Sequence, residues 1–306
     1  MLPFWRARRR PYTQGSTAMA TRRTFLAGAL ASTIAPEFTV RAQPQRGIIG
    51  VHWIDHIPVR WVQPARHRSG VNAVIWLNHL GGGMDALDRQ LTELAEAGYI
   101  AISFDTWQHG RRATETEDQI LARVFGNFRQ HMWPILGQSA LEATRVIDWV
   151  QASFPIPNQV HIGGISMGGD IAVAVAGLDP RVRSVAAIVA TPDWLRPGMR
   201  DLFEPSQLLD PGMADPYATF FYDTLNPLTH LERYDREVAI SFECAADDTH
   251  VPPQGALQFQ TALDEREAAA EVRVQLHPNR THRQLRDPVF WSQSLAWFDR
   301  HSDLRA

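Results

Sequence analysis

The sequence of 306 residues contains no lysine, because all 30 of its basic residues are arginine. This absence excludes every reaction in which a lysine amine acts as the base or forms a Schiff base with the substrate. Cysteine is almost as scarce, since Cys244 is the single one. One cysteine can form neither a disulfide within the chain nor a metal site of several thiolates. Cys244 stands in the apolar, strand-like run VAISFECAA, and we expect it to be a small buried core residue.

The chain also has no large excess of positive or negative charge. The formal net charge is −3, and charged residues make up 21% of the chain against 44% hydrophobic residues. These proportions are typical of a soluble globular protein. No arginine-rich stripe follows the first 25 residues. We therefore expect no nucleic acid partner.

Residues 1–42 are predicted to be a twin-arginine export signal. Residues 21–26 read TRRTFL, and the apolar run AGALASTIA follows at 27–35. The sequence VRA then offers a small-residue cleavage site after Ala42. The apolar run is too short to span a bilayer, which predicts no stable membrane anchor. An ordinary amphipathic helix is the alternative interpretation of this segment.

The signal predicts a periplasmic or secreted protein whose partner during export is the twin-arginine translocase. Met19 stands directly before the signal. It offers a second start site, which would place residues 1–18 upstream of the true start.

After about residue 47, apolar strand-like runs alternate with amphipathic segments. Strands are expected at about 71–78, 99–105, 159–166, 182–190, 238–246 and 272–277. Helices are expected at about 84–98, 139–154, 167–178, 254–265 and 288–301. This alternation predicts an α/β domain over residues 43–306, with a mostly parallel central sheet and helices on both faces. Residues 47–64 are typical of an antiparallel edge pair.

The longest irregular stretch, residues 191–237, is rich in proline, aspartate and aromatic residues. A stretch of this length inside a compact domain is usually functional, and we interpret it as a small lid between two strands. Its aromatic residues either line an apolar pocket or pack the lid onto the core; they are Trp194, Phe203, Tyr217, Phe220, Phe221 and Tyr222.

The sequence GGISMGG contains the pattern G-x-S-x-G at Gly164, Ser166 and Gly168. It lies where a buried strand meets a helix of small residues, which is the setting of a nucleophile elbow. The turn holds the serine hydroxyl clear of the sheet and places the Met167 N–H where it can stabilise an oxyanion. A tight strand-to-helix turn without activity is the alternative.

A nucleophilic serine needs a base, and four histidines follow the acid candidates in the chain. His250 lies two residues from the likely acid, and His301 falls inside the last helix. His277 ends a strand, whereas His282 lies in the polar loop PNRTHRQ before that helix. We therefore expect His282 to be the base, and His277 is the alternative.

The acid is expected at the end of the strand VAISFECAA, which runs into Asp247 and Asp248. Adjacent residues that leave a strand point to opposite sides, so only one of the two can serve. Asp248 has the spacing of a D-x-x-V-P loop and is the favoured acid. The second oxyanion donor is expected in the loop NHLGGGMD, from the N–H of Leu80 or of Gly81.

Together these motifs resemble the small bacterial carboxylesterases near the dienelactone-hydrolase and prolyl-oligopeptidase-like branches of the α/β-hydrolase superfamily. The resemblance covers residues 70–300 and rests on the glycine-rich loop, FD-x-x-x-HG-x-R, GGISMGG, DDTHVPP and NRTHR. It implies the α/β-hydrolase fold, a triad of Ser166, Asp248 and His282, and no cofactor. It implies a structural role for Asp105 and His109.

One departure concerns the oxyanion loop. Many relatives carry His-Gly before the oxyanion residue, and Asn78-His79 stands there in this chain.

The expected activity is hydrolysis of a small-molecule ester through an acyl-enzyme on Ser166. The aromatic lid favours short-chain or aromatic esters over charged ones. A peptidase or thioesterase with the same triad is the first alternative, although the compact lid and the lack of a propeller-like domain argue against an oligopeptidase. An exported binding protein without turnover is the second. A dehalogenase would need aspartate at position 166, and a dienelactone hydrolase proper would need cysteine.

A zinc site is a further alternative, because His52, Asp55 and His56 have the spacing H-x-x-D-H. The neighbouring apolar residues predict a strand at this position, so no metal is expected.

Overall fold

The computed structural model describes residues 49–65 and 71–302. The chain divides into Met1–Gln43 and Pro44–Ala306, and only the second unit contains described residues. The predicted export signal lies outside them. None of the helices in the described part combines the length and the hydrophobicity that a membrane crossing requires.

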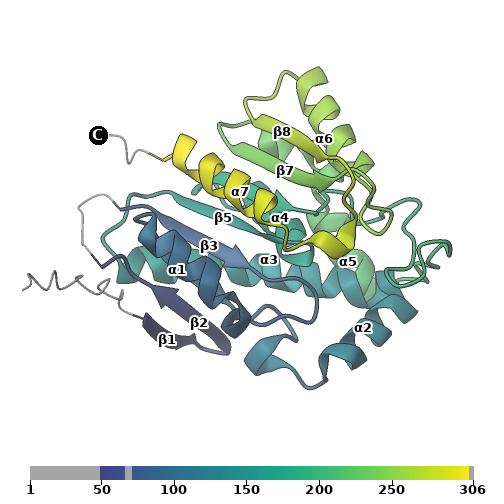
Figure 1. The fold of residues 1–306 in the computed structure, drawn as a ribbon, viewed down its shortest axis with the longest axis horizontal. Helices are drawn as coiled ribbons and strands as arrows, with labels where there is room; N and C mark the ends of the chain where they lie inside the picture. Colours follow the sequence, from purple (N-terminus) through teal and green to yellow (C-terminus); the bar gives the residue numbers. More distant parts are fainter. Residues whose placement is uncertain (1–48, 66–70, 303–306) are drawn as a thin grey trace, which may run out of the picture. The chain divides into compact units, whose positions relative to one another are not determined.

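An eight-stranded sheet with the order β1-β2-β4-β3-β5-β6-β7-β8 forms the centre of the fold (Figure 1). The strands are β1 (Ile49–Ile54), β2 (Ile57–Val62), β3 (Ala73–Leu77), β4 (Ile100–Phe104), β5 (Val160–Ile165), β6 (Val182–Ile188), β7 (Ala239–Ala245) and β8 (Glu271–His277). β1 and β2 form the predicted antiparallel edge pair, and β2 pairs antiparallel with β4. All other neighbours are parallel, which confirms the predicted mostly parallel sheet.

Helices cover both faces of the sheet, as the sequence predicts. They are α1 (Asp88–Glu96), α2 (Glu117–Gly126), α3 (Phe128–Ser153), α4 (Met167–Leu178), α5 (Pro216–Leu225), α6 (Gln254–Glu265) and α7 (Pro288–Arg300). α1 and α7 pack in one apolar cluster on one face, where Figure 1 shows them in front of the sheet. α2 to α6 contribute to a second cluster on the other face.

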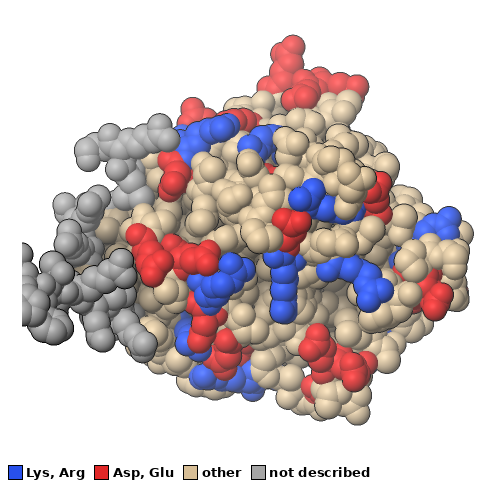
Figure 2. All heavy atoms as spheres, in the orientation of Figure 1, with Lys and Arg blue, Asp and Glu red and all other residues tan. Residues whose placement is uncertain are grey.

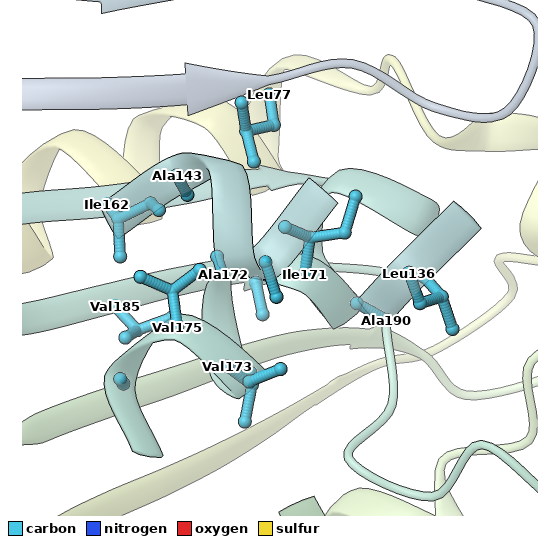
Figure 3. Packing of buried hydrophobic residues seen from close by; sticks show 14 of the residues in the cluster. Leu77, Leu136, Ala143, Ile162, Ile171, Ala172, Val173, Val175, Val185 and Ala190 are labelled. Atoms are coloured by element: carbon cyan, nitrogen blue, oxygen red, sulfur yellow. The ribbon is translucent and has the colours of Figure 1, made fainter. Parts of the chain in front are cut away.

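The two faces follow from the alternation of side chains along each strand. In β3, Ile75 belongs to the cluster under α3 and α4, whereas Trp76 belongs to the cluster under α1 and α7. Figure 3 shows part of the first cluster, to which Ile171 and Val175 of α4 and Ile162 of β5 belong. Each fully buried side chain of this size contributes about 1.5–3 kcal/mol to folding.

The structure extends the sequence prediction in one region. α2 was not expected, and α3 begins at Phe128, eleven residues before the helix predicted at 139–154. Thr116 and Gln119 form a capping box at the start of α2. Pro134 lies inside α3, although proline normally ends a helix.

The segment predicted to be a lid contains α5 and two 3₁₀ turns, η3 (Pro227–Thr229) and η4 (Leu231–Tyr234). Helix α5 packs on α3, where the ring of Phe221 fills the space beside Gly137. Tyr222 stacks on Trp133 with ring centroids 4.4 Å apart. The Trp133 Nε1–H also donates to the carbonyl oxygen of Trp194 at 3.0 Å. These contacts hold α5 and Trp194 on α3.

Acidic and basic side chains intermingle on the face drawn in Figure 2. Many of them pair, as in Arg60 with Asp85 and Arg89 with Glu93. Exposed pairs of this kind contribute about 0–1 kcal/mol each, so they balance charge more than they stabilise the fold. Cys244 is buried in β7, as the sequence predicts.

Candidate active site

Ser166 lies at the turn between β5 and α4 with φ 52° and ψ −117°. A positive φ is costly for a residue with a side chain, by about 1–3 kcal/mol, and it is typical of functional turns. The flanking glycines make the turn possible. A Cβ on Gly168 would lie 2.6 Å from the carbonyl oxygens of Leu77 and Asn78, and a Cβ on Gly164 would lie 2.6 Å from the backbone of Gly168. Only glycine fits at either position.

His282 follows β8 in a short 3₁₀ turn, η5 (His282–Gln284), which begins with a capping box between Thr281 and Gln284. Its Nε2 lies 3.0 Å from the Ser166 Oγ, and its Nδ1 lies 2.8 Å from Asp248 Oδ2. An ionised carboxylate only accepts hydrogen bonds, so Nδ1–H donates to Asp248 and Nε2 accepts from the serine hydroxyl. The three side chains are buried, at 4–7% exposure.

Asp248 is fixed at the end of β7 by its own loop. Its Oδ1 accepts the backbone N–H groups of His250 at 2.9 Å and Val251 at 2.8 Å, which leaves Oδ2 for His282. This is the geometry that the D-x-x-V-P spacing builds. The neighbouring Asp247 is exposed, and its backbone N–H donates to the carbonyl oxygen of Arg280.

The other histidines considered from the sequence have different partners. His277 Nε2 lies 2.7 Å from Glu243 Oε2, in a buried cluster that also holds Arg273. The His250 ring lies 5.0 Å from that of His282, and its Nδ1 contacts the carbonyl oxygen of Arg200 at 2.9 Å. Burial lowers the pKa of His250 to about 3, so this imidazole is neutral at pH 7. His301, at the end of α7, lies 3.7 Å from Glu271.

The predicted oxyanion donors lie at the start of α4 and in the loop after β3. Met167 is the first residue of α4, and Leu80 borders the same cavity as Ser166. Within the described residues, the N–H groups of Met167, Leu80 and Gly81 donate to no acceptor. Free N–H groups at a helix N-terminus are well suited to a developing negative charge.

Asn78 holds the loop that carries Leu80. Its Nδ2–H donates to the carbonyl oxygen of Gly83 at 2.9 Å, and its Oδ1 accepts the His79 N–H at 2.9 Å. The His79 Nδ1 in turn contacts the carbonyl oxygen of Leu80 at 2.9 Å. Burial lowers the pKa of His79. Asn78, which stands where many relatives carry histidine, thus links the two ends of this loop through its side chain.

Asp105 and His109 take positions behind this loop. Asp105 accepts the backbone N–H groups of Met84 at 2.7 Å and Arg111 at 2.8 Å, and so joins two loops. His109 Nδ1 contacts the carbonyl oxygen of Trp107 at 2.8 Å, and burial lowers its pKa to about 4. Neither side chain lines the cavity at Ser166. These contacts agree with the structural role that the resemblance implies.

The cavity at Ser166 has a volume of about 60 Å³. Its apolar lining residues are Leu80, Leu121, Phe125, Phe128, Met132, Leu202 and Leu285. Of the two interpretations of the lid aromatics, the structure favours packing, because none of them lines this cavity. Trp194 and Phe221 are buried in packing against α3 and the core, whereas Phe203, Tyr217 and Phe220 are exposed. The segment 191–237 instead contributes Leu202 and Arg196.

Sequence reasoning therefore missed the pocket wall formed by α2 and α3. The signal was present, because Leu121, Phe125, Phe128 and Met132 follow a spacing of four, three and four residues. A capping-box pattern at residues 116–119 precedes them. The break between α2 and α3 at Asn127 interrupts this pattern.

The H-x-x-D-H motif lies in the β1–β2 hairpin, where each member has a separate partner. His52 stacks on Trp149, Asp55 pairs with Arg145, and His56 Nε2 lies 3.0 Å from Glu142. No group of three or more potential metal ligands occurs among residues 49–65 and 71–302.

Comparison with known proteins places this geometry among hydrolases. The protein YtaP of Bacillus subtilis, which is assigned as a hydrolase, is 22% identical over 245 residues, covering 69% of this chain and 81% of the relative. The acylaminoacyl peptidase of Pyrococcus horikoshii has a TM-score of 0.64 at 14% identity, over 87% of this chain and 43% of that chain. A Klebsiella pneumoniae protein assigned as a dienelactone hydrolase has a TM-score of 0.59 at 18% identity. The match covers 82% of this chain and 98% of that chain.

These similarities confirm the α/β-hydrolase fold. Together with the family match that follows, they confirm a serine hydrolase near the dienelactone-hydrolase and prolyl-oligopeptidase branches. The sequence profile of the prolyl oligopeptidase family matches residues 127–305, which is more than half of the sequence. The chain therefore belongs to the prolyl oligopeptidase family.

Proposed function

We propose that this protein hydrolyses carboxylic esters with small acyl groups through an acyl-enzyme on Ser166. The observation that carries the proposal is the continuous row of hydrogen bonds from Ser166 Oγ through His282 to Asp248, at 3.0 and 2.8 Å. A serine is nucleophilic when a neighbouring base can take its proton and a third group holds that base in one tautomer.

In the first half-reaction, Ser166 Oγ attacks the ester carbonyl carbon while His282 Nε2 takes the hydroxyl proton. Asp248 stabilises the imidazolium that forms and keeps Nδ1–H directed toward Oδ2. The carbonyl oxygen becomes an oxyanion, for which the N–H groups of Met167 and Leu80 are the proposed donors. His282 then gives its proton to the leaving alkoxide, which departs as the alcohol.

In the second half-reaction, a water molecule attacks the acyl-enzyme. His282 Nε2 takes a proton from the water, and the second tetrahedral intermediate collapses to the free acid. The proton returns to Ser166 Oγ. The reaction consumes one water and needs no cofactor.

The cavity supports a preference for short acyl chains. A volume of about 60 Å³ accommodates a group of a few heavy atoms, and its wall is mostly apolar. Leu121 and Phe125 of α2 close one side. We expect acetyl and propionyl esters to react faster than octanoyl esters.

Peptide cleavage is the second candidate, and the family match is the observation that favours it. The same triad serves both reactions, because an amide also passes through an acyl-enzyme. The difference is the leaving group, since an amine needs protonation from His282 before it departs. Substrates that share one acyl group and differ in the leaving atom separate the two functions.

The test is a set of p-nitrophenyl esters from acetyl to octanoyl, with acetyl p-nitroanilide and an acetyl thioester as matched substrates. We expect the highest kcat/KM for acetyl or propionyl esters, and a loss of at least about 10³-fold in Ser166→Ala. Undiminished ester turnover in Ser166→Ala would refute the mechanism. A higher kcat/KM for the anilide than for the ester would establish a peptidase.

Labelling with a fluorophosphonate probe supplies a control that needs no knowledge of the substrate. The probe should modify Ser166 in the wild type and leave Asp248→Asn and His282→Ala largely unmodified. A probe that labels a different residue would place the nucleophile elsewhere.

We also propose that the protein acts outside the cytoplasm, on the basis of Arg22 and Arg23 in the predicted signal. Replacing both with lysine should retain the full-length chain in the cytoplasm, as measured by cell fractionation. Export that continues in this variant would refute the twin-arginine route and leave the ester chemistry untouched.

A further inference from the structure

A second and larger cavity, of about 320 Å³, adjoins the one at Ser166. The two share Arg196 as a lining residue. The apolar side chains of Leu195, Met199, Leu208 and Leu209 contribute to the remaining wall. Arg129, Pro197, Gly198 and Pro211 form the rest of it. The volume lies in the range of small-molecule sites. None of the steps proposed for ester cleavage uses this cavity.

Arg196 is held rigidly in the shared wall. It is 4% exposed, and it forms a buried ion pair with Asp170 of α4. Its guanidinium also lies 5.0 Å from the centroid of the Phe128 ring. The backbone has φ 49°, an unusual conformation for a residue with a side chain. The Nε–H is buried and donates to no acceptor among the described residues. A buried donor without a partner is costly, so a ligand that brings an acceptor to this Nε–H would be stabilised.

Arg129 supplies a positive charge that is not neutralised. It lies in the first turn of α3, where no acidic residue stands, and it forms no salt bridge within the described residues. Its Nε–H is likewise buried without an acceptor among them. A cation at a helix N-terminus is repelled by the helix dipole, so this position favours a bound anion.

Asp210, in the neighbouring loop, does not neutralise the charge of Arg129. Asp210 is exposed and accepts the Gly212 N–H at 3.0 Å. The guanidinium of Arg129 makes only a long contact, at 3.5 Å, with the carbonyl oxygen of Gly212. Arg129 is therefore an available charged donor in a cavity whose wall, apart from Arg196, consists mainly of apolar residues.

We propose that this cavity is a binding site for a small organic acid. The carboxylate lies at Arg129 and the Arg196 Nε–H, because planar guanidinium groups bind carboxylates with strong, charge-assisted hydrogen bonds. The apolar body of the acid packs among Leu195, Leu208 and Leu209. The site adjoins the cavity at Ser166 through Arg196, but it contains none of the triad residues and does not depend on the proposed esterase activity.

Isothermal titration with hexanoate tests the charge requirement. Hexanamide has nearly the same shape and no charge, and we expect it to bind at least about tenfold more weakly than hexanoate. Arg129→Gln should weaken hexanoate binding by a similar factor. Arg145→Gln is the matched control, because it removes one positive charge from the same helix sixteen residues away and should leave binding unchanged. Equal binding of hexanamide, or an unaffected Arg129→Gln variant, would overturn the proposal.

A second pair of variants tests the location. Leu208 and Leu202 belong to the same loop segment, but Leu208 lines the larger cavity and Leu202 lines the cavity at Ser166. Leu208→Glu places a carboxylate beside the proposed site and should weaken hexanoate binding at least about tenfold. Leu202→Glu should leave it within about twofold. The reverse pattern would place the acid in the cavity at Ser166 and would overturn the proposal. Circular dichroism shows that each variant is folded.

Discussion

Replacing Asp248 by asparagine should disable the base while leaving the fold intact. In the wild type, Oδ1 accepts two backbone N–H groups and Oδ2 accepts the His282 Nδ1–H. Asparagine has one oxygen and one NH₂ group. Two backbone donors hold the amide oxygen at the Oδ1 position, so the NH₂ group must face His282. The NH₂ group and the His282 Nδ1–H are both donors and would face each other, unless the imidazole moves its proton to Nε2.

The tautomer change removes the base. With Nδ1 as the acceptor, Nε2 carries the proton and can no longer take one from Ser166 Oγ. Loss of the correct tautomer in a serine triad costs about 10⁴-fold in kcat, which is about 5.4 kcal/mol of barrier. The effect on stability should be small, because the asparagine retains both backbone hydrogen bonds.

The assay is kcat/KM on p-nitrophenyl acetate, with the thermal midpoint as the control for folding. Asp247→Asn is the matched control, because its side chain is exposed. It should retain wild-type activity. A nitrogen NMR spectrum of the His282 imidazole reports the tautomer directly. Activity of Asp248→Asn within about tenfold of the wild type, in a folded protein, would refute the assignment of the acid.

Three further predictions concern stability, each measured by urea unfolding. Gly168→Ala should lower the free energy of unfolding by about 3 kcal/mol or prevent folding, because its Cβ would clash with backbone oxygens, whereas Gly126→Ala has open space and should be neutral or stabilising. Asp170→Asn should cost about 3–5 kcal/mol, since it leaves Arg196 buried without its counter-ion; a loss below 1 kcal/mol would contradict this. Burial lowers the pKa of His161 to about 3, so the unfolded chain, with a pKa near 6.5, takes up the proton first as pH falls. The contribution of His161 to the free energy of unfolding is therefore fully present above pH 6.5 and is lost as the pH falls toward 3. Between pH 7.5 and 5, the free energy of unfolding of His161→Gln should fall by about 2 kcal/mol less than that of the wild type.

The sheet and most helices could be predicted because their signals are local. The predicted helices at 167–178 and 254–265 match α4 and α6 residue for residue. Strands β3 to β8 lie within the predicted runs or within one residue of them. Buried parallel strands are continuous apolar runs, and glycine or polar residues bound them.

The pocket wall could not be predicted with the same ease, because it depends on contacts between distant segments. The aromatic residues of the lid segment show this. Their sequence predicts an apolar surface, yet whether that surface faces the substrate or α3 is decided by Trp133 and Gly137, about sixty to ninety residues earlier in the chain. The Arg196 ion pair with Asp170 joins residues that are 26 positions apart in the sequence, and nothing in the local pattern around either residue indicates it.

The choice between His277 and His282 follows from the width of the sheet. Ser166 follows β5, and β8 is three strands away in the order β5-β6-β7-β8, which is roughly 14 Å at the usual spacing of about 4.8 Å. His277 stands at the end of β8 and reaches one strand, to Glu243 on β7. The five residues that lead to His282 can span up to roughly 17 Å, enough for the chain to return across β7 and β6. This return places the His282 imidazole beside the end of β7. There Asp248, which follows β7, accepts the hydrogen bond from Nδ1–H. The two imidazoles have the same chemistry, and distance across the sheet decides which of them can reach Ser166.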